Sequence, residues 1–178
     1  MLTPDGDSRI AYAFFDTRLG PALLAATEGG LCALRLCPPE AAESKIEELR
    51  REYPTASLRA DREAVRLYAD ELLDFLAGRS EDFRPRLDIV YGTAFQRRVW
   101  AELQQTRPGE VLSYGELARR IGQPSAARAV GGACARNGIA VAVPCHRAVR
   151  GDGSPSGFRW GLDWKSRLLA LEAEIARR

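Results

Sequence analysis

The chain has 178 residues, of which 46% are hydrophobic and 28% are charged. These fractions are close to those of globular proteins and exclude collagen-like, coiled-coil and intrinsically disordered chains. No apolar run approaches the roughly 20 residues that a membrane helix needs, and the first residues show no signal-peptide pattern. We therefore expect a cytoplasmic chain of one or two small domains with no membrane partner.

The net charge is only +2, but the two halves of the chain differ in sign. Residues 1–88 carry 12 basic and 17 acidic side chains, whereas residues 89–178 carry 14 basic and 7 acidic ones. A basic second half indicates a polyanionic partner such as nucleic acid. A solvated basic face without a partner gives the same composition, so charge alone leaves both interpretations open.

The chain contains four cysteines and a single histidine, His146. No two cysteines form a CxxC pair, and four are too few for a dense disulfide framework. We therefore expect free thiols and no metal ion or other cofactor, because a Cys/His zinc site would need most of the four cysteines to converge.

The first half of the chain is predicted to be a small α+β domain. Three short apolar runs separated by glycine-containing turns are typical of strands. These runs are residues 9–15, 22–27 and 30–36. Apolar residues at helical spacing predict helices over residues 41–53 and 61–77, and residues 87–90 are a further candidate strand. None of these residues indicates chemistry.

The second half begins with two capping boxes, at Thr93 and at Ser113, in which a Glu or Gln three residues later reaches back to the cap. Ser125 is expected to cap a third helix after a tight turn. The expected helices cover residues 94–105, 114–121 and 126–136. The short second helix, the turn and the third helix form the pattern of a helix-turn-helix.

The third of these helices, AARAVGGACAR, has almost no large side chain. Gly131 and Gly132 each cost a helix about 1 kcal/mol relative to alanine. Small residues let a helix approach a neighbour closely, and that neighbour is either another helix or the backbone of a nucleic acid. In the second interpretation Arg128 is the one long side chain that protrudes near the start of the helix.

Residues 139–143 are predicted to form a buried strand, which leads into Cys145 and His146. Residues 150–161 contain three glycines and are predicted to be a loop, after which Asp163 is expected to cap a last helix. A cysteine beside a histidine and basic residues is a candidate nucleophile, since the pKa of a thiol falls near positive charge. The alternative is a buried structural cysteine, because neighbouring side chains often point apart.

The sequence around Cys145 resembles a known family. The segment PCHR at residues 144–147, with Asn137 upstream and a Ser/Gly-rich loop downstream, resembles the methylated-DNA–protein-cysteine methyltransferases, also called O6-alkylguanine-DNA alkyltransferases. The resemblance runs almost without gaps from Gly92 to Gly153 and extends to Glu172. Within it, FRWG at residues 158–161 is most similar to the C-terminal domain of the Ada adaptive-response proteins.

The resemblance implies an α+β fold with two domains. Residues 1–88 would form a small N-terminal ribonuclease-H-like α/β domain, which matches more loosely. Residues 89–178 would form a mostly helical C-terminal domain that contains the helix-turn-helix and carries the alkyltransferase chemistry.

The resemblance also implies an activity: direct, irreversible and stoichiometric transfer of a methyl group from O6 of guanine, and from O4 of thymine, in DNA to Cys145. His146 would take the thiol proton through a water molecule, and Glu172 would orient its imidazole. Tyr114 would donate a proton to the base, and Asn137 would organise the turn around the site. No second cysteine with a resolving role is evident, so each molecule would act once.

The target base must be flipped out of the duplex, and Arg128 would take its place in the stack. The helix over residues 126–136 would lie in the minor groove of double-stranded DNA with little sequence preference, and the protein is expected to be a monomer. The residues implied in DNA contact are Ser113, Ala126, Ala127, Arg128, Ala129, Gly131, Gly132 and Arg136. Those implied in substrate binding are Trp100, Val149, Phe158 and Arg159.

Two departures from the family pattern stand out. Some members bind zinc through histidines of the N-terminal domain, and a chain with His146 alone cannot supply that site. Phe158 stands where many relatives have tyrosine, so a hydroxyl contact near the alkyl group is absent. The alternative functions are a helix-turn-helix regulator with Cys145 as a redox-sensing thiol, a non-catalytic lesion-binding protein and a thiol hydrolase.

Overall fold

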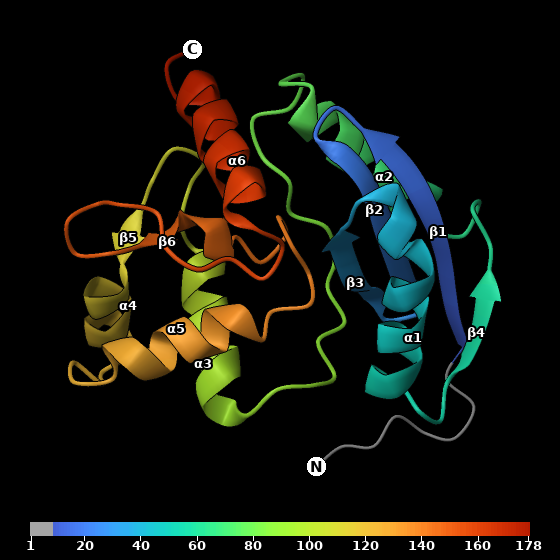
Figure 1. Ribbon diagram of the computed structural model, residues 1–178, viewed down its shortest axis with the longest axis horizontal. Helices are drawn as coiled ribbons and strands as arrows, with labels where there is room; N and C mark the ends of the chain where they lie inside the picture. Colours follow the sequence, from blue (N-terminus) through green and yellow to red (C-terminus); the bar gives the residue numbers. More distant parts are fainter. Residues whose placement is uncertain (1–8) are drawn as a thin grey trace. The chain divides into compact units, whose positions relative to one another are not determined.

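The computed structural model describes residues 9–178, so the first eight residues of the predicted first domain lie outside the described part. The chain forms two compact units, the first ending at Tyr91 and the second beginning at Gly92 (Figure 1). Among the described residues, no helix combines the length and apolarity that crossing a bilayer requires.

The first unit contains a four-stranded sheet in the order β3-β2-β1-β4. Its strands are β1 (Arg9–Thr17), β2 (Gly20–Thr27), β3 (Gly30–Leu36) and β4 (Ser57–Ala60). The first three are antiparallel neighbours and confirm the three predicted strands. The fourth pairs parallel with β1. It was not predicted, because SLRA is short, only half apolar and lies at an edge of the sheet.

Two helices pack on this sheet, α1 (Ala42–Glu52) and α2 (Arg66–Leu76), and both were predicted. A short 3-10 helix, η1 (Pro39–Ala41), precedes α1. Residues 87–90 do not form the predicted strand, since Leu87 makes only an isolated bridge with Leu31.

The core beside α1 shows how the first unit is held together. Leu49 and Tyr53 pack against Ile10, Ala33 and Cys32, and α1 lies in front of the sheet in Figure 1. The Tyr53 hydroxyl donates to the Cys32 carbonyl oxygen at 3.1 Å. Cys32 is thus a buried structural residue, as expected from its position in an apolar strand.

The second unit is mostly helical. In chain order it contains α3 (Ala94–Gln104), β5 (Leu112–Ser113), α4 (Tyr114–Arg120), α5 (Ala127–Ala135), η2 (Cys145–Arg147), β6 (Ala148–Val149) and α6 (Leu162–Ile175). The helices α3, α4 and α5 contact one another, and α6 contacts η2 (Figure 1). The two short strands β5 and β6 pair in parallel. The predicted helix-turn-helix is formed by α4 and α5.

Local sequence signals explain where the first two of these helices begin. Thr93 Oγ1 accepts from the Gln96 amide at 3.2 Å, and the Gln96 side chain accepts from the Thr93 amide at 2.9 Å. Ser113 and Glu116 form the same reciprocal pair at the start of α4, at 3.1 and 2.7 Å. Both predicted capping boxes are confirmed.

Two predicted caps are wrong. The helix α5 is preceded by Ala126 at the cap position, and Ser125 does not cap it. The last helix, α6, is capped by Gly161 with φ of 103°, and the side chain of Asp163 makes no cap hydrogen bond. In both cases a residue with a suitable side chain lies near the helix start, but the backbone turns into the helix one or two residues away from it.

The predicted strand over residues 139–143 is also wrong. The segment is buried but folds into consecutive tight turns, in which the Ala142 amide donates to the Ala140 carbonyl oxygen at 2.7 Å and the Val143 amide to that of Ile139 at 3.0 Å. Val141 adopts a positive φ of 66°, in the left-handed region. An apolar run shows burial, but a strand also needs a pairing partner, and this segment pairs with neither β5 nor β6.

Candidate functional site

The site is built around Cys145, the first residue of η2. The thiol is buried, with the residue 2% exposed, yet it lies in the wall of a cavity of about 990 Å³. The other walls come from α4, α5 and the loop over residues 150–161. A small reactant in the cavity can therefore reach the sulfur atom, although the residue is almost completely buried.

Asn137 holds the turns that carry Cys145. Its Nδ2 donates to the Val143 carbonyl oxygen at 2.8 Å and to Cys145 Sγ at 3.1 Å. Its Oδ1 accepts from the Ile139 amide at 2.9 Å. One fully buried side chain thus ties both ends of the 139–145 segment together and places the sulfur.

Burial raises the pKa of the Cys145 thiol. The Asn137 hydrogen bond and the positive charges of Lys165 and Arg159 offset only part of this effect. The sequence predicted a lowered pKa from the number of basic neighbours, so the direction differs from that expectation. Reaction as a thiolate therefore requires a base that removes the proton.

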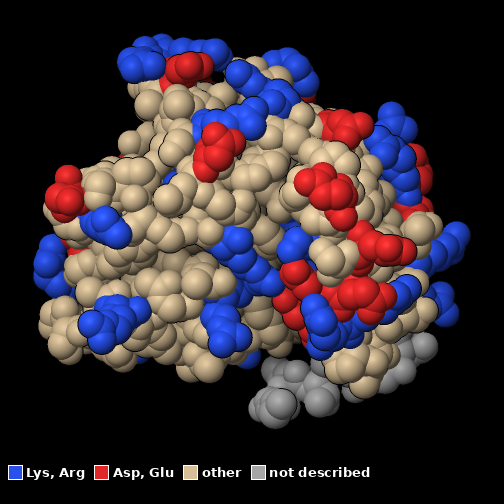
Figure 2. Space-filling view, viewed as in Figure 1, with Lys and Arg blue, Asp and Glu red and all other residues tan. Residues whose placement is uncertain are grey.

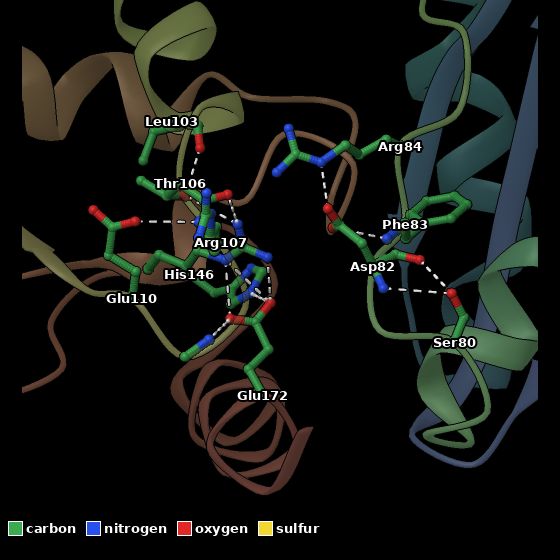
Figure 3. A network of polar contacts seen from close by, with 12 residues as sticks. Ser80, Asp82, Phe83, Arg84, Leu103, Thr106, Arg107, Glu110, His146 and Glu172 are labelled. Atoms are coloured by element: carbon green, nitrogen blue, oxygen red, sulfur yellow. Dashed lines mark hydrogen bonds and ion pairs between the residues drawn. The ribbon is translucent and has the colours of Figure 1, made fainter. Parts of the chain in front are cut away.

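His146 and Glu172 form the next part of the site. His146 Nε2 lies 2.8 Å from Glu172 Oε1, and both residues are fully buried (Figure 3). Burial alone raises the pKa of Glu172, but the charge and hydrogen bonds of His146 and of Arg147 outweigh it and lower the pKa to about 2. An ionised carboxylate only accepts hydrogen bonds. We infer that Nε2 carries a hydrogen and donates it to Glu172.

The other ring nitrogen, His146 Nδ1, is buried and has no hydrogen-bond partner among residues 9–178. In the neutral form of this ring Nδ1 holds a free lone pair, so it is the proton acceptor of the ring. Phe158, from the 150–161 loop, packs edge-on against the imidazole with ring centroids 6.4 Å apart and an interplanar angle of 82°. The imidazole is therefore held by Glu172 and by Phe158.

Tyr114, the first residue of α4, reaches the cavity from the opposite side. Its hydroxyl donates to the Ser156 carbonyl oxygen at 3.0 Å, and burial raises its pKa. Lys165 Nζ donates to the same Ser156 oxygen at 2.8 Å and to the Ala148 carbonyl oxygen at 2.5 Å. Lys165 and Arg147 were not among the sequence-predicted residues, because their partners lie on other elements.

Of the four residues predicted to bind substrate, two line this cavity and two do not. Trp100 is buried in the core, where its Nε1 donates to the Ala133 carbonyl oxygen at 3.0 Å. Val149 is buried in β6. Neither lines the cavity, whereas Phe158 and Arg159 do. Arg159 also donates to the Asn137 carbonyl oxygen at 3.2 Å.

Four of the eight residues predicted to contact DNA are exposed along α5 and at its end, and the other four are partly buried. The exposed side of α5 consists of Arg128, Ala129, Gly132, Ala135 and Arg136. A Cβ atom at Gly132 would have no described atom within 4 Å. Packing against another helix therefore does not explain Gly132. Figure 2 shows basic side chains over this part of the molecule with few acidic ones between them.

The remaining thiols offer no metal site. All four cysteines are free and buried. Within the described residues, no group of three or more His, Cys, Asp or Glu side chains is arranged to hold a metal ion.

Two family models match almost the whole chain. The model for the DNA binding domain of 6-O-methylguanine DNA methyltransferase matches residues 94–174, and the model for its ribonuclease-like domain matches residues 10–89.

Similar proteins of known sequence bear related names. The bifunctional transcriptional activator/DNA repair enzyme Ada of Escherichia coli is 42% identical over 95% of this chain. The chain spans only 47% of that protein, about half its length. The methylated-DNA–protein-cysteine methyltransferase of Methanosarcina acetivorans is 39% identical, over 90% of this chain and 97% of that protein.

Solved structures agree with these matches. The O6-methylguanine methyltransferase of Mycobacterium tuberculosis superposes with a TM-score of 0.76 at 35% identity, over 93% of both chains. A structure of the Mycobacterium tuberculosis protein in complex with DNA gives a TM-score of 0.73 at 35% identity, over 94% of both chains.

Proposed function

Because the chain belongs to the methylated-DNA–protein-cysteine methyltransferase family, we propose that it repairs DNA by moving the methyl group from O6 of guanine directly to Cys145. The observation that supports this most is the placement of Cys145 in the wall of an accessible cavity. The residue that follows it, His146, has a buried Nδ1 that no described residue bonds and that can accept a proton. We include O4-methylthymine as a proposed substrate, because it presents the same kind of alkylated oxygen.

The reaction is a single in-line displacement. The Cys145 sulfur attacks the methyl carbon, a carbon–sulfur bond forms, and the bond between the methyl carbon and guanine O6 breaks. The thiol loses one proton, and the guanine anion that leaves gains one, so atoms and charge balance. The product thioether is not hydrolysed by water, and each molecule therefore acts once.

The proton movements follow from the resting state of the site. Since burial raises the pKa of Cys145, the sulfur is a neutral thiol at rest. His146 Nδ1 accepts its proton through one water molecule, and ionised Glu172 stabilises the imidazolium that forms. The Tyr114 hydroxyl exchanges its Ser156 partner for N3 of the base and donates the proton that makes guanine a better leaving group. Backbone groups of Cys145 and Arg159 hold the edge of the base.

DNA is the polymer that carries this substrate, and α5 is the element best suited to approach it. Its exposed small residues let the helix enter the minor groove of the double helix, with affinity that comes mainly from phosphate contacts and shows little sequence preference. Arg128 lines the cavity near the start of α5 and would replace the flipped base in the stack. The Mycobacterium tuberculosis structure in complex with DNA supports a DNA partner.

Three further points belong to the proposal. The chain acts as a monomer, because one copy supplies every residue named above. It acts in the cytoplasm, where its four cysteines stay reduced. Its domains divide between residues 88 and 92, close to the ends of the two family matches.

The test is an intact-mass measurement after incubation with double-stranded DNA that carries O6-methylguanine. We expect a gain of one methyl group, mapped to Cys145, with unmethylated DNA as the blank. Cys145→Ala should abolish the gain and retain DNA binding, whereas Cys32→Ala, which changes a buried cysteine of the first unit, should leave transfer intact. Folded, reduced protein that gains no methyl group would refute the proposal. Gain of oxygen or loss of two hydrogens in its place would favour the redox regulator.

Arg128→Ala tests base flipping separately. Repair of duplex DNA should fall far more than methyl transfer from the free base O6-methylguanine, because the free base needs no flipping. Equal losses on both substrates would remove Arg128 from that role.

A further inference from the structure

Arg147 is almost completely buried, at 3% exposed, and its guanidinium contacts two elements at once. Toward α6, Nε donates to Glu172 Oε2 at 2.9 Å and to Oε1 at 3.2 Å, and Nη2 donates to Oε1 at 2.8 Å. On the other side, Nη1 donates to the Thr106 carbonyl oxygen at 2.6 Å and to its Oγ1 at 3.0 Å. The planar guanidinium therefore has a single available orientation.

The same contacts fix the carboxylate of Glu172. Oε1 accepts from both His146 Nε2 and Arg147, and Oε2 accepts from Arg147 Nε and from the Gly109 amide at 3.3 Å (Figure 3). The carboxylate cannot rotate without breaking a charge-assisted hydrogen bond. Arg147, which follows His146 in the chain, thus fixes Glu172, and Glu172 in turn fixes the direction in which His146 Nδ1 points.

Charge balance gives Arg147 a second effect. A buried carboxylate without a partner would attract a proton to itself or to the imidazole beside it. Arg147 supplies a positive charge that balances Glu172 through direct hydrogen bonds. We propose that Arg147 is a positioning residue for methyl transfer, which fixes Glu172 and balances its charge. This inference rests on the proposed function.

The other charged groups near this pair face different partners. On α6, Lys165 donates to the carbonyl oxygens of Ala148 and Ser156 and faces Cys145. Arg159, on the loop, also faces Cys145 and donates to the Asn137 carbonyl oxygen. Glu110, between α3 and β5, accepts from the exposed Arg107 amide at 3.2 Å. Among residues 9–178, Arg147 is therefore the arginine or lysine that bonds directly to Glu172.

The experiment measures the single-turnover rate of methyl transfer against pH, from about pH 5 to pH 9, for the whole chain. Arg147→Gln removes the charge, and the acid limb of the profile should move to higher pH by about 1–3 units, the effect of an opposite charge at hydrogen-bond distance. Arg147→Lys keeps the charge but not the paired hydrogen bonds. Its acid limb should stay in place, while the plateau rate of methyl transfer falls at least about tenfold. A well-placed general base raises a rate by about 10²–10⁴-fold, and this variant would lose part of that factor.

Arg35→Gln is the matched control. Arg35, in the first unit, is also buried, and it pairs with Glu52 at 2.6 Å and with Glu48 at 3.4 Å. It has no role in the proposed reaction. Its loss should lower stability without moving the acid limb. Comparing each variant at equal folded fraction, measured by denaturation, separates stability from positioning.

The outcomes are distinct. If wild-type protein transfers no methyl group, the proposed function fails. If wild type transfers and Arg147→Gln keeps the wild-type acid limb, or loses rate only in proportion to its unfolded fraction, the inference about Arg147 fails. Should Arg147→Gln not fold, Arg147→Lys decides, and a wild-type plateau in that variant overturns the positioning role.

Discussion

The ionised, buried Glu172 makes the second unit sensitive to acid, and this sensitivity can be calculated. Its pKa is lowered from 4.5 to about 2 in the folded chain, after the charge and hydrogen bonds of His146 and Arg147 outweigh the effect of burial. A carboxyl group whose pKa is lowered on folding stabilises the fold above its unfolded pKa. That contribution is lost as the pH falls through the folded value.

The magnitude follows from the size of the shift. A difference of about 2.5 units corresponds to about 3 kcal/mol, since each unit is worth about 1.4 kcal/mol. The full contribution is present above about pH 5, and about 2 kcal/mol of it is already lost at about pH 3. Glu116 and Asp152 also have lowered pKa values through hydrogen bonds with Ser113 and Ser154, so the effect of Glu172 must be measured as a difference.

The assay is urea denaturation at a series of pH values between about 7 and 3, followed by tryptophan fluorescence. All three tryptophans, at positions 100, 160 and 164, lie in the second unit and report on it. We compare wild type with the double variant Glu172→Gln/Arg147→Met, which removes both members of the pair and leaves no lone buried charge. The free energy of unfolding of wild type should fall by about 2 kcal/mol more than that of the variant. Parallel pH profiles would show that Glu172 is not held ionised, and the argument for the His146 tautomer would fail with it.

Three further predictions concern the surroundings of the site. Asn137→Ala leaves the Val143 carbonyl oxygen and the Cys145 thiol without their shared donor. The free energy of unfolding in urea should fall by about 2–4 kcal/mol, whereas a fall of less than about 1 kcal/mol would mean that other contacts hold the turn. Gly132→Ala should stabilise α5 by about 0.5–1 kcal/mol in thermal melts and at the same time weaken duplex binding in a titration, and unchanged affinity would place DNA elsewhere. At Gly109, φ is 84°, and an added Cβ would lie only 2.6 Å from that of Ala176. We therefore expect Gly109→Ala to lower the free energy of unfolding by about 2 kcal/mol. An unchanged free energy would contradict the tight fit of this turn beside Glu172.

Much of the fold could be predicted because its signals are local. The strands β1, β2 and β3 are apolar runs separated by glycines, and the capping boxes at Thr93 and Ser113 require only residues three apart. The polar strand β4 was missed because it depends on pairing with β1, which lies more than forty residues earlier. The turns over residues 139–143 were mistaken for a strand because burial alone does not reveal whether a backbone finds a partner.

The site divides in the same way. The neighbours Cys145 and His146 were candidates from the sequence pattern alone, whereas Glu172, 26 residues after His146, entered only through the family resemblance. Arg147 was missed because its role depends on two distant partners, Glu172 and Thr106. The basic residues near Cys145 favoured a low thiol pKa, but burial, which a single sequence does not show, raises it.

The buried thiol suits the proposed mechanism, in which each molecule reacts once. A resting thiolate would be oxidised or alkylated by small molecules, and each such event would consume one molecule without repair. Burial keeps Cys145 protonated, and in the proposed mechanism the His146 imidazole, which contacts Glu172 and Phe158, removes the proton. Ionisation is therefore linked to the filling of the cavity, because a bound base excludes bulk water and places the methyl carbon where the new charge on sulfur develops. The arrangement thus lowers the reactivity of the sulfur toward small molecules in general and favours reaction with a substrate that fits the cavity.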